Sequence, residues 1–476
     1  MVYSKVNIYA LVNILNIGSV VLGEWYVPGT PTPPEPEQPD WFKESIVAWY
    51  SPYCKQRMTN FDVIEAYAED FTKWAYRNYR GTAKITNNTI VITNVVETNN
   101  IVEDNNEPYS DLTIRVTGVT ENKYLIVRQG RGKPETYIKK DGVYTFKDNN
   151  LYFGFGVSVI GECNITITQL PTSILKDFSG NGNHAYLYGG KGKLNSGMGV
   201  YKFDFLSDLR INSAYLPYTE RQDDKICSLA GHPAGWLFQF TSLSDIPAFK
   251  VEVKGIVNDR FIYRYYDENG NRGKEIIINK DGIYELPISY SVENNTGVGI
   301  VCNNIFQDNV CFTQIPDYPD QLCYDGSMCA VVYEFPILTD YTIIVDRTWF
   351  NIRDISCFIG KRNTSGDNLG AFEFEFRANR TFSFGENNVI IFADNNIVYQ
   401  TKNSYNGTEI KPGSLDDTDV LIIGAAQRNV NNKIQDPYIG CHGNILLFNR
   451  SLTEYEISWV KNNMMCSKQQ EHDIDL

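Results

Sequence analysis

The stretch DFSGNGNHAYLYG, residues 177–189, begins like a loop and ends like a strand. Gly180 and Gly182 permit left-handed backbone, and the Asp, Ser and Asn side chains around them can bond nearby backbone groups. A phosphate loop would have a Lys after the glycines and then a helix, and neither follows. The alternatives are a metal loop and a plain turn, and we predict a turn that leads back into a β-sheet through the Tyr-Leu-Tyr.

The composition of the chain favours an all-β protein of more than one domain. Its 476 residues exceed one ordinary core, and its 31 Tyr and 25 Phe are residues that prefer strands. The net charge of −14 argues against a nucleic-acid groove, which needs a basic surface to neutralise phosphates. It argues equally against an anionic membrane surface, so we predict neither nucleic acid nor membrane as a partner.

The ten Cys form no CxxC pair and no Cys/His cluster at zinc spacing. Their density is below that of a disulfide scaffold, so we predict that most of them are reduced and that the protein assembles in a cytoplasm. Cys302 with Cys311 and Cys323 with Cys329 are the pairs that can bond on exposure to an oxidant.

Residues 1–27 form an N-terminal arm, and its stretch VNIYALVNILNIGSVVLG, 6–23, is apolar and uncharged. A signal peptide would have a more basic beginning and an A-x-A-like cleavage site. A membrane helix needs about 20 predominantly apolar residues and would be a poor one with three Asn. We predict an anchor that docks into another protein, and a weak signal peptide is the alternative. The contact residues of this anchor are expected to be Tyr9, Leu11, Ile14 and Leu15.

Residues 28–40 read PGTPTPPEPEQPD and are predicted to form a spacer. Pro fixes φ and removes a backbone donor, which excludes a helix or an inner strand. Polyproline II geometry at ~3.1 Å per residue gives roughly 40 Å of semi-rigid chain. An apolar arm followed by a stiff spacer and folded modules suits an appendage that projects from a surface.

Two stretches of the chain resemble each other. The segment IKKDGVY at 138–144 matches INKDGIY at 278–284, and each copy later ends in Thr-Gln-apolar-Pro. Alternating apolar residues around a Lys-Asp-Gly turn are typical of a β-hairpin. We therefore predict two copies of a small β-sandwich module, at 82–171 and 246–318.

Residues 59–81 are predicted to form a helix. Ile64, Tyr67, Phe71 and Trp74 recur at helical spacing, with acidic residues toward the N-terminal end and basic residues toward the C-terminal end. We interpret the aromatic stripe as core packing rather than as a ligand site.

The remaining pieces resemble a known family when they are taken in order. They are an A-W-Y strand in 44–53, the D-x-SGNGNH stretch, an F-D strand in 201–218, a T-I-x-V strand, an I-I-G strand and GNILLFNRSLTEYEI at 443–457. The last piece predicts a strand, a turn and a helix opened by the capping box Thr453-x-x-Glu456. This order resembles the concanavalin A-like lectin/glucanase jelly roll in its laminin-G-like or pentraxin-like form.

The resemblance implies a mainly β fold in which a discontinuous jelly-roll sandwich carries both modules as insertions, because the family normally has its first two pieces close together. The expected jelly roll comprises 41–58, 172–245 and 319–466. The helix and the first module stand in its first gap, and the second module stands in its second gap. A polar tail, 467–476, ends the chain.

Some members of that family bind Ca²⁺ through loop oxygens, and Asp177, Asn181 and Asn183 are hard donors of that kind. A full site would need further carboxylates, which the sequence does not identify. We therefore predict no metal and no cofactor, with these three residues as weak calcium candidates. Cys441-His442 is the only adjacent Cys/His pair, and we interpret it as a buried thiol beside a strand-end imidazole.

Glycanases of this fold resemble one another in a strand reading E-x-D-x-E, and Glu373-Phe-Glu375 is the nearest match. A retaining pair needs its carboxyls ~5–5.5 Å apart, and two residues in strand alternation do share a face. The middle Asp is absent, however. Phe372, Phe374 and Phe376 should define the buried face and leave the glutamates in solvent, so we predict that the protein is not an enzyme.

Repeated β-modules inserted into a lectin-like jelly roll, behind an arm and a spacer, resemble virion fibre and decoration proteins of tailed phages that infect gut Bacteroidota, the crAss-like phages among them. The resemblance implies a structural head fibre or capsid-attached appendage of the virion, assembled in the cytoplasm of the bacterial host. The arm would bind a capsid or other virion protein, and the β-domains would adhere to host or mucosal glycans. A homo-oligomer, dimer or trimer, is expected, without a coiled coil because no heptads occur. The alternative is a secreted bacterial carbohydrate-binding, lectin-like protein.

Overall fold

The computed structural model of the protein consists of two units, Met1–Gln38 and Pro39–Leu476. Described residues begin at Gln38, so the predicted arm with Tyr9, Leu11, Ile14 and Leu15, most of the spacer and the polar tail lie outside them. The structure describes residues 38–52, 66–76, 82–93, 99–104, 111–129, 134–147, 153–159, 164–189, 197–198, 209–221, 225–240, 245–273, 275–291, 297–315, 318, 321–350, 355–361, 372–378, 381–383, 389–391, 397–410, 420–428 and 434–465.

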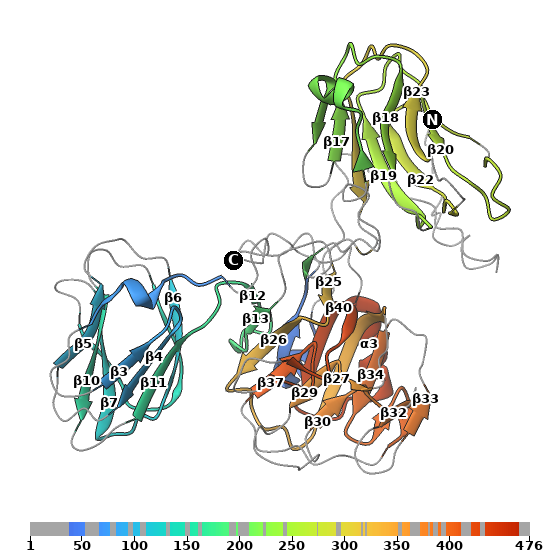
Figure 1. The fold of residues 1–476 in the computed structure, drawn as a ribbon. Helices are drawn as coiled ribbons and strands as arrows, with labels where there is room; N and C mark the ends of the chain where they lie inside the picture. Colours follow the sequence, from blue (N-terminus) through green and yellow to red (C-terminus); the bar gives the residue numbers. More distant parts are fainter. Residues whose placement is uncertain are drawn as a thin grey trace, which may run out of the picture. The chain divides into compact units, whose positions relative to one another are not determined.

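The second unit is built almost entirely of antiparallel strands, which confirms the prediction of a mainly β protein (Figure 1). Two of its sheets, which we call sheets 1 and 2, make up the body. Sheet 1 has the order β14 (Gly197–Met198), β25 (Leu322–Asp325), β40 (Ile439–Phe448), β27 (Thr342–Trp349), β34 (Ile397–Thr401), β35 (Ser404–Tyr405), β36 (Thr408–Glu409), and β1 (Ile46–Tyr50) also pairs with β40. Sheet 2 has the order β12 (Ile174–Leu175), β13 (Ala185–Gly189), β26 (Met328–Tyr333), β37 (Val420–Ile423), β29 (Ile359–Lys361), β30 (Phe372–Phe374).

Strand alternation gives sheet 1 two buried faces. Ile343 and Leu447 belong to the main core cluster, to which sheet 2 contributes residues such as Leu187 and Ile423. The intervening residues, among them Ile344 and Leu446, belong to a second cluster with α2 (Asp40–Ser45) and α3 (Glu454–Asn463). Successive side chains of a strand point to opposite faces, so the near-continuous apolar run ILLF in β40 is explained by burial on both sides.

The first strand of the described chain pairs with the last. In β1, Ala48 lies opposite Leu447 and Tyr50 lies opposite Ile445 of β40. On its other edge β40 pairs with β27, where Ile343 lies opposite Leu447. Residues 46–50 and 445–448, which are far apart in the sequence, are therefore hydrogen-bonded neighbours.

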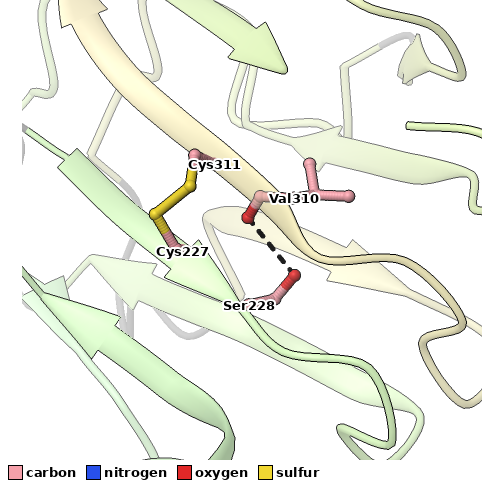
Figure 2. Close-up of a disulfide and its surroundings, with 4 residues drawn as sticks. All are labelled: Cys227, Ser228, Val310 and Cys311. Carbon is pink, nitrogen blue, oxygen red and sulfur yellow. Dashed lines mark hydrogen bonds between the residues drawn. A yellow bond between two sulfur atoms is a disulfide. The ribbon is translucent and has the colours of Figure 1, made fainter. Parts of the chain in front are cut away.

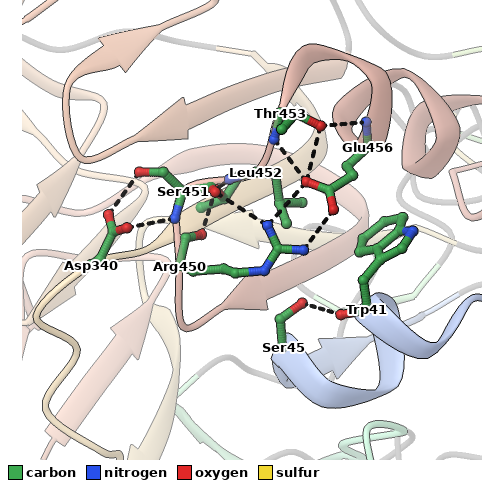
Figure 3. A network of polar contacts seen from close by, with 9 residues as sticks. Trp41, Ser45, Asp340, Arg450, Ser451, Leu452, Thr453 and Glu456 are labelled. Atoms are coloured by element: carbon green, nitrogen blue, oxygen red, sulfur yellow. Dashed lines mark hydrogen bonds and ion pairs between the residues drawn. The ribbon is translucent and has the colours of Figure 1, made fainter.

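The end of β40 is fixed to α3 by a polar network (Figure 3). Thr453 and Glu456 form the predicted capping box, with both reciprocal bonds present. Arg450 donates to both carboxylate oxygens of Glu456, at 3.0 and 2.6 Å. The Arg450 hydrogen bond lowers the pKa of the Glu456 carboxyl to about 2. Asp340 accepts from the N–H and the hydroxyl of Ser451, at 2.8 and 2.7 Å.

Each of the other large sheet pairs forms a module of ten strands. In the first module the sheets run β2 (Ala75–Tyr76), β5 (Asn99–Asp104), β10 (Phe153–Val159), β7 (Lys123–Gln129), β8 (Thr136–Ile138) and β3 (Thr82–Ile85), β4 (Thr89–Thr93), β11 (Asn164–Gln169), β6 (Leu112–Thr117), β9 (Gly142–Phe146). In the second they run β15 (Leu209–Arg210), β18 (Gly235–Phe240), β23 (Gly299–Cys302), β20 (Phe261–Arg264), β21 (Ile276–Ile278) and β16 (Thr219–Arg221), β17 (Lys225–Ser228), β24 (Val310–Ile315), β19 (Phe249–Lys254), β22 (Gly282–Leu286). Taken in chain order, the strands of the two modules occupy the same places, and each module buries its own core.

Smaller pieces complete the second unit. One short sheet has the order β28 (Ile355–Ser356), β31 (Phe376–Ala378), β32 (Thr381–Ser383), β33 (Val389–Ile391). In the chain, β28 precedes β30 and the other three strands follow it. A separate pair consists of β38 (Gln427–Arg428) and β39 (Ile434–Gln435). Two 3₁₀ turns, η2 (Phe71–Lys73) and η4 (Ser213–Tyr218), precede strands of the first and second modules.

The repeated Lys-Asp-Gly turn is not a hairpin, and that prediction is wrong. In both modules it joins two sheets, because β8 pairs only with β7 whereas β9 pairs only with β6, and β21 and β22 behave likewise. Tyr144 and Tyr284 each donate to the carbonyl of the Lys four residues earlier, at 2.6 and 2.7 Å. Asp141 and Asp281 accept the N–H of residues 119 and 256, at 2.9 and 2.7 Å. The repeated Lys, Asp and Tyr residues are therefore those whose hydrogen bonds hold the connection between the two sheets of each module.

The second module is larger than its predicted range of 246–318. Its strands begin at Leu209, so residues 209–240, which the sequence assigned to the jelly-roll range 172–245, contribute β15 to β18 to the module instead. The module's core shows the same division, because Ile226 and Phe238 are buried with Phe312. Short alternating strands look alike in sequence whichever sheet they join, so composition does not assign them.

The predicted helix at 59–81 is wrong over the part that the structure describes. Residues 66–76 contain only the turn η2 and the short strand β2. The side chain of Gln169 bonds both the N–H and the C=O of Glu69, at 2.8 Å each, and so engages groups that a helix would use internally. Two residues of the predicted stripe, Phe71 and Trp74, do pack in a core, where they are buried with Phe155. Tyr67 is half-buried, and Ile64 lies outside the described residues.

The described cysteines pair differently from the sequence expectation. Cys311 of β24 is bonded to Cys227, which lies directly opposite it on β17, rather than to Cys302 (Figure 2). Cys323 and Cys329 are not bonded to each other, because Cys323 lies in sheet 1 and Cys329 in sheet 2. Strand register, which the spacing of cysteines does not reveal, decides which thiols meet.

We predict that Gly118→Ala and Gly255→Ala destabilise their modules far more than Gly180→Ala destabilises the body. All three glycines have positive φ, near 86°, 97° and 85°, which costs a residue with a Cβ about 1–2 kcal/mol. A Cβ at 118 or 255 would also lie 2.0 or 2.2 Å from a backbone oxygen, whereas one at 180 would contact nothing. Thermal unfolding with peptide-level hydrogen exchange checks this, and equal effects at the three positions would contradict it.

Candidate functional site

The loop 177–184 closes a gap in the pairing of β1. Between Ile46 and Ala48 the register with β40 shifts, which leaves Val47 as the extra residue of a β-bulge. The carbonyl of Val47 accepts from the side chains of Asn181 and Asn183, at 3.1 and 2.8 Å, and from the Ser179 hydroxyl at 3.1 Å. The loop therefore supplies bonds to a backbone group that the ladder passes over.

Asp177 organises this loop through both carboxylate oxygens. Oδ1 accepts the N–H groups of Trp49 and Ser179, at 2.9 Å each. Oδ2 accepts the Ser179 hydroxyl at 2.9 Å and the Asn183 N–H at 3.0 Å. Gly180 and Gly182 have φ of 85° and 78°, and the chain then enters β13, as the sequence predicts.

The three calcium candidates are thus brought together, with their polar groups directed at backbone. Asp177 has two donors on each oxygen, and the amide groups of Asn181 and Asn183 donate to carbonyls of β1. Within the described residues, no group of three or more His, Cys, Asp or Glu is placed to hold a metal ion. This arrangement joins the loop 177–184 to the bulge in β1 by hydrogen bonds, which is a structural role.

A buried ion pair lies inside the body, and sequence reasoning missed it. Arg347 of β27 is 2% exposed and Glu375, between β30 and β31, is 0% exposed. Nε of Arg347 donates to Oε2 at 2.8 Å and Nη2 donates to Oε1 at 2.5 Å. Trp349 Nε1 donates to Oε2 at 3.0 Å, and the Tyr405 hydroxyl donates to Oε1. All of the donors come from sheet 1, and the acceptor comes from the end of sheet 2.

The position of Glu375 corrects the expectation that Glu373 and Glu375 share a solvated face. Glu375 has a φ of 55°, which breaks the strand between β30 and β31. Before it the chain pairs with β29 of sheet 2, and after it the chain pairs with β28 and β32. The alternation ends at this residue, so its carboxylate turns inward to Arg347. The side chain of Glu373 lies outside the described ones.

The surroundings favour the charged form of Arg347 and the neutral form of Tyr405. Burial alone would lower the pKa of Arg347, but the attraction of Glu375 raises it above its ordinary value. Burial and the charge of Glu375 both raise the pKa of the Tyr405 hydroxyl. A carboxylate that accepts from a guanidinium, an indole and a phenol has its lone pairs in use. The pair can orient and stiffen the two sheets, but as placed it has no free oxygen for a substrate.

Cys441 and His442 are both fully buried, which confirms the buried thiol, but the imidazole lies inside β40, opposite Leu322 and Arg347, rather than at a strand end. His442 faces Tyr324, with Nε2 and the hydroxyl 3.1 Å apart, and its Nδ1 is 2.7 Å from the Gly443 carbonyl. Burial lowers the pKa of His442 to about 4. Burial also raises the pKa of the Cys441 thiol. Both groups are therefore neutral at ordinary pH.

One sequence signal could have identified the ion pair. In TIIVDRTW, 342–349, strand alternation places Arg347 on the same face as Ile343 and Val345. Those two residues belong to the main core. A charged residue at a core position demands an opposite charge, but no local pattern identifies Glu375 as its partner.

The comparisons with known proteins are few. No family model and no curated protein matches the chain. Solved structures with some likeness include a Trypanosoma rangeli sialidase in complex with sialic acid, at 10% identity, 81% coverage of this chain, 84% of that chain and a TM-score of 0.22. Vicilin from Corylus avellana (hazelnut) is 6% identical over 51% of this chain and 85% of that one, with a TM-score of 0.13. Likeness at this level carries no argument about function.

Neither helix in the described part of the chain is long and apolar enough to cross a membrane.

We predict that Asp177→Ala destabilises the body by about 2–4 kcal/mol, because it leaves several donors near a buried strand without their acceptor. Asp325→Ala is the matched control, since Asp325 accepts from Ser327 in its own exposed turn, and its loss should cost less. Chemical denaturation measures both. Calcium should leave the unfolding midpoint of the native protein unchanged, and a rise that Asp177→Ala abolishes would restore the metal-loop interpretation.

We predict that Arg347→Met and Glu375→Leu each lower the free energy of unfolding by about 3–5 kcal/mol, because each leaves one charge buried and unpaired. The double variant should cost much less than the sum, which a double-mutant cycle in denaturant measures. Glu285→Gln is the control, because the Lys250–Glu285 pair is exposed and should contribute little. Additive losses at Arg347 and Glu375 would contradict this account.

Proposed function

We propose that this protein is a structural component of a phage virion, a head fibre or capsid-attached appendage that displays β-domains outward. The observation that carries the proposal is the repeated module. One body of paired sheets, closed by its first and last strands, carries two ten-strand modules of the same strand order. Repetition of a rigid surface module on one support suits display and adhesion.

The way in which the chain leaves and re-enters the body supports this role. The first module stands between β1 and β12, and the second stands between β14 and β25, so each is held at both of its ends. An insertion with two covalent connections is constrained more than a terminal domain on one linker. The jelly-roll class of the body, a homo-oligomeric state and adhesion to host or mucosal glycans belong to the same proposal.

The proposal includes a structural rather than an enzymatic role. Glu375 is one of the two glutamates that most resemble a glycanase catalytic pair in sequence. Its carboxylate accepts hydrogen bonds from Arg347, Tyr405 and Trp349. A general acid or nucleophile of a glycanase must reach the scissile bond, and a carboxylate that is 0% exposed does not.

The anchor of this protein is proposed to be the apolar arm at 1–27, separated from the body by the Pro-rich segment at 28–40. Pro39 directly precedes α2, which packs with α3 on the outer face of sheet 1. The folded unit is acidic overall, as the chain's net charge of −14 requires. The arm ahead of it, with its uncharged apolar stretch 6–23, is the segment best suited to bury apolar surface in a capsid protein.

We predict that replacing Tyr9, Leu11, Ile14 and Leu15 with Ser abolishes incorporation into particles. Each buried apolar side chain contributes about 1.5–3 kcal/mol to the contact, so four losses should outweigh a typical affinity. The full-length variant is co-expressed with the capsid proteins of the phage that encodes it, and particles purified by density are probed for the chain.

The matched control replaces Asn7, Asn13 and Asn16 in the same arm with Ser, which should leave incorporation intact. Equal incorporation of the apolar variant would place the anchor elsewhere and overturn this part of the proposal. The secreted lectin-like alternative gains support from the Cys227–Cys311 bond, because disulfides persist in oxidising compartments. N-terminal sequencing of the native protein decides between them: an arm removed as a signal peptide would favour secretion.

A further inference from the structure

Two thiols of the body face each other across neighbouring strands. Cys323 of β25 lies directly opposite Cys441 of β40 in antiparallel register. Both are 0% exposed and form a small cluster that Tyr318 and Phe350 cover in part. The Cys441 thiol donates to Oε1 of Gln321 at 2.8 Å, and the Cys323 thiol donates to the Gln321 carbonyl at 3.6 Å. Register and a shared partner, Gln321, therefore bring the two thiols together.

The same arrangement is a disulfide elsewhere in the molecule. Cys227 and Cys311 are also direct cross-strand neighbours, on β17 and β24, and they are bonded. The other unbonded cysteines of the described residues have no thiol opposite them. Cys329 lies opposite Tyr188, Cys302 lies opposite Gly235 and Phe261, and Cys357 lies outside the strands. Register singles out one further pair.

The pair lies where the second module joins the body. The chain leaves sheet 1 after β14, builds the module over 209–315 and returns in β25. β14 and β25 are neighbours, with Gly197 opposite Cys323. β25 in turn is the only link between this edge and β40 among the described strands. A covalent bond from β25 to β40 would fix the return strand of the module to the strand on which the whole sheet is built.

We propose that Cys323 and Cys441 oxidise to a second cross-strand disulfide that locks the root of the second module onto β40. A low-molecular-weight disulfide such as oxidised glutathione is the oxidant. One cysteine, as its thiolate, attacks a glutathione sulfur and releases one glutathione thiolate. The other cysteine then attacks the protein sulfur of this mixed disulfide and releases the second. The two thiol protons pass to the released glutathione or to solvent, so one disulfide is reduced while one forms.

Burial controls the rate of this step. The thiolate is the reacting form, and neither sulfur is exposed in the closed sheet. The oxidant therefore reaches the pair only when the edge opens, and the edge strand β14 has just two residues. On the proposed virion role, the thiols would stay reduced in the host cytoplasm and the bond would form after release. The bond itself requires only an oxidising environment.

The test uses the full-length chain, purified in reductant and then equilibrated over a series of reduced and oxidised glutathione ratios. Free thiols are alkylated in denaturant and the protein is digested without reductant for mass spectrometry. We expect a peptide pair that joins Cys323 to Cys441, in addition to the one that joins Cys227 to Cys311. Alkylation of both Cys323 and Cys441 at ratios that fully oxidise Cys227 and Cys311 would overturn the proposal, as would linkage of either residue to another cysteine.

Variants separate the lock from a general effect of losing a buried thiol. Oxidation should raise the thermal midpoint of the native protein, and added reductant should reverse that rise. In Cys323→Ser or Cys441→Ser the part of the rise due to this bond should vanish, whereas Cys329→Ser should keep it. An equal rise in all three variants would overturn the proposal. Failure of particle incorporation leaves this result unaffected, because the measurement needs no capsid.

Discussion

The pairing of β40 with three other strands is the constraint on which the body depends. Its first half pairs with β25, its second half pairs with β1, and β27 runs along its other edge. β1 comes from the beginning of the described chain, and β25 and β27 come from its later part. Sheet 1 is therefore complete only when the last strand is in place. Such non-local closure is costly in chain entropy. This entropy cost is offset by apolar residues that bury both faces of β40 and by polar loops that hydrogen-bond to the neighbouring strands.

The loop at 177–184 is the clearest example of such fastening. A bulge in β1 frees the Val47 carbonyl from the ladder, and a buried carbonyl without a partner is expensive. The Asn and Ser side chains of the loop bond it, while Asp177 holds the loop itself to the N–H of Trp49. The glycines are needed because the chain must turn tightly to bring three side chains onto one carbonyl. The Asn-Gly-Asn sequence thus serves a strand that lies more than a hundred residues earlier.

The sequence predicted well where a feature is local. The strand after Asn183, the left-handed glycines and the capping box at Thr453 all depend on residues within a few positions of one another. The sequence-based predictions were wrong where contacts with a distant part of the chain determine the local structure. The Lys-Asp-Gly turn has hairpin chemistry but joins two sheets. Phe71 and Trp74 have helical spacing but lie in a 3₁₀ turn and directly after it. Glu375 was predicted to face solvent because the residues next to it in the sequence indicate neither its left-handed backbone nor its partner Arg347.

The two kinds of non-local bond in the body differ in what they require. The Arg347–Glu375 pair joins the two sheets through charges whose desolvation offsets much of their attraction, so its geometry restricts how the sheets lie more than it stabilises them. It sits where the chain leaves sheet 2 at Glu375 for the sheet of β31. The Cys323–Cys441 contact instead joins neighbours within one sheet, at the root of an insertion. Two thiols packed in register need no desolvated charge, so this pair avoids the penalty that the ion pair carries. The proposed oxidation would therefore add a covalent root to the second module between two residues that the ladder already aligns.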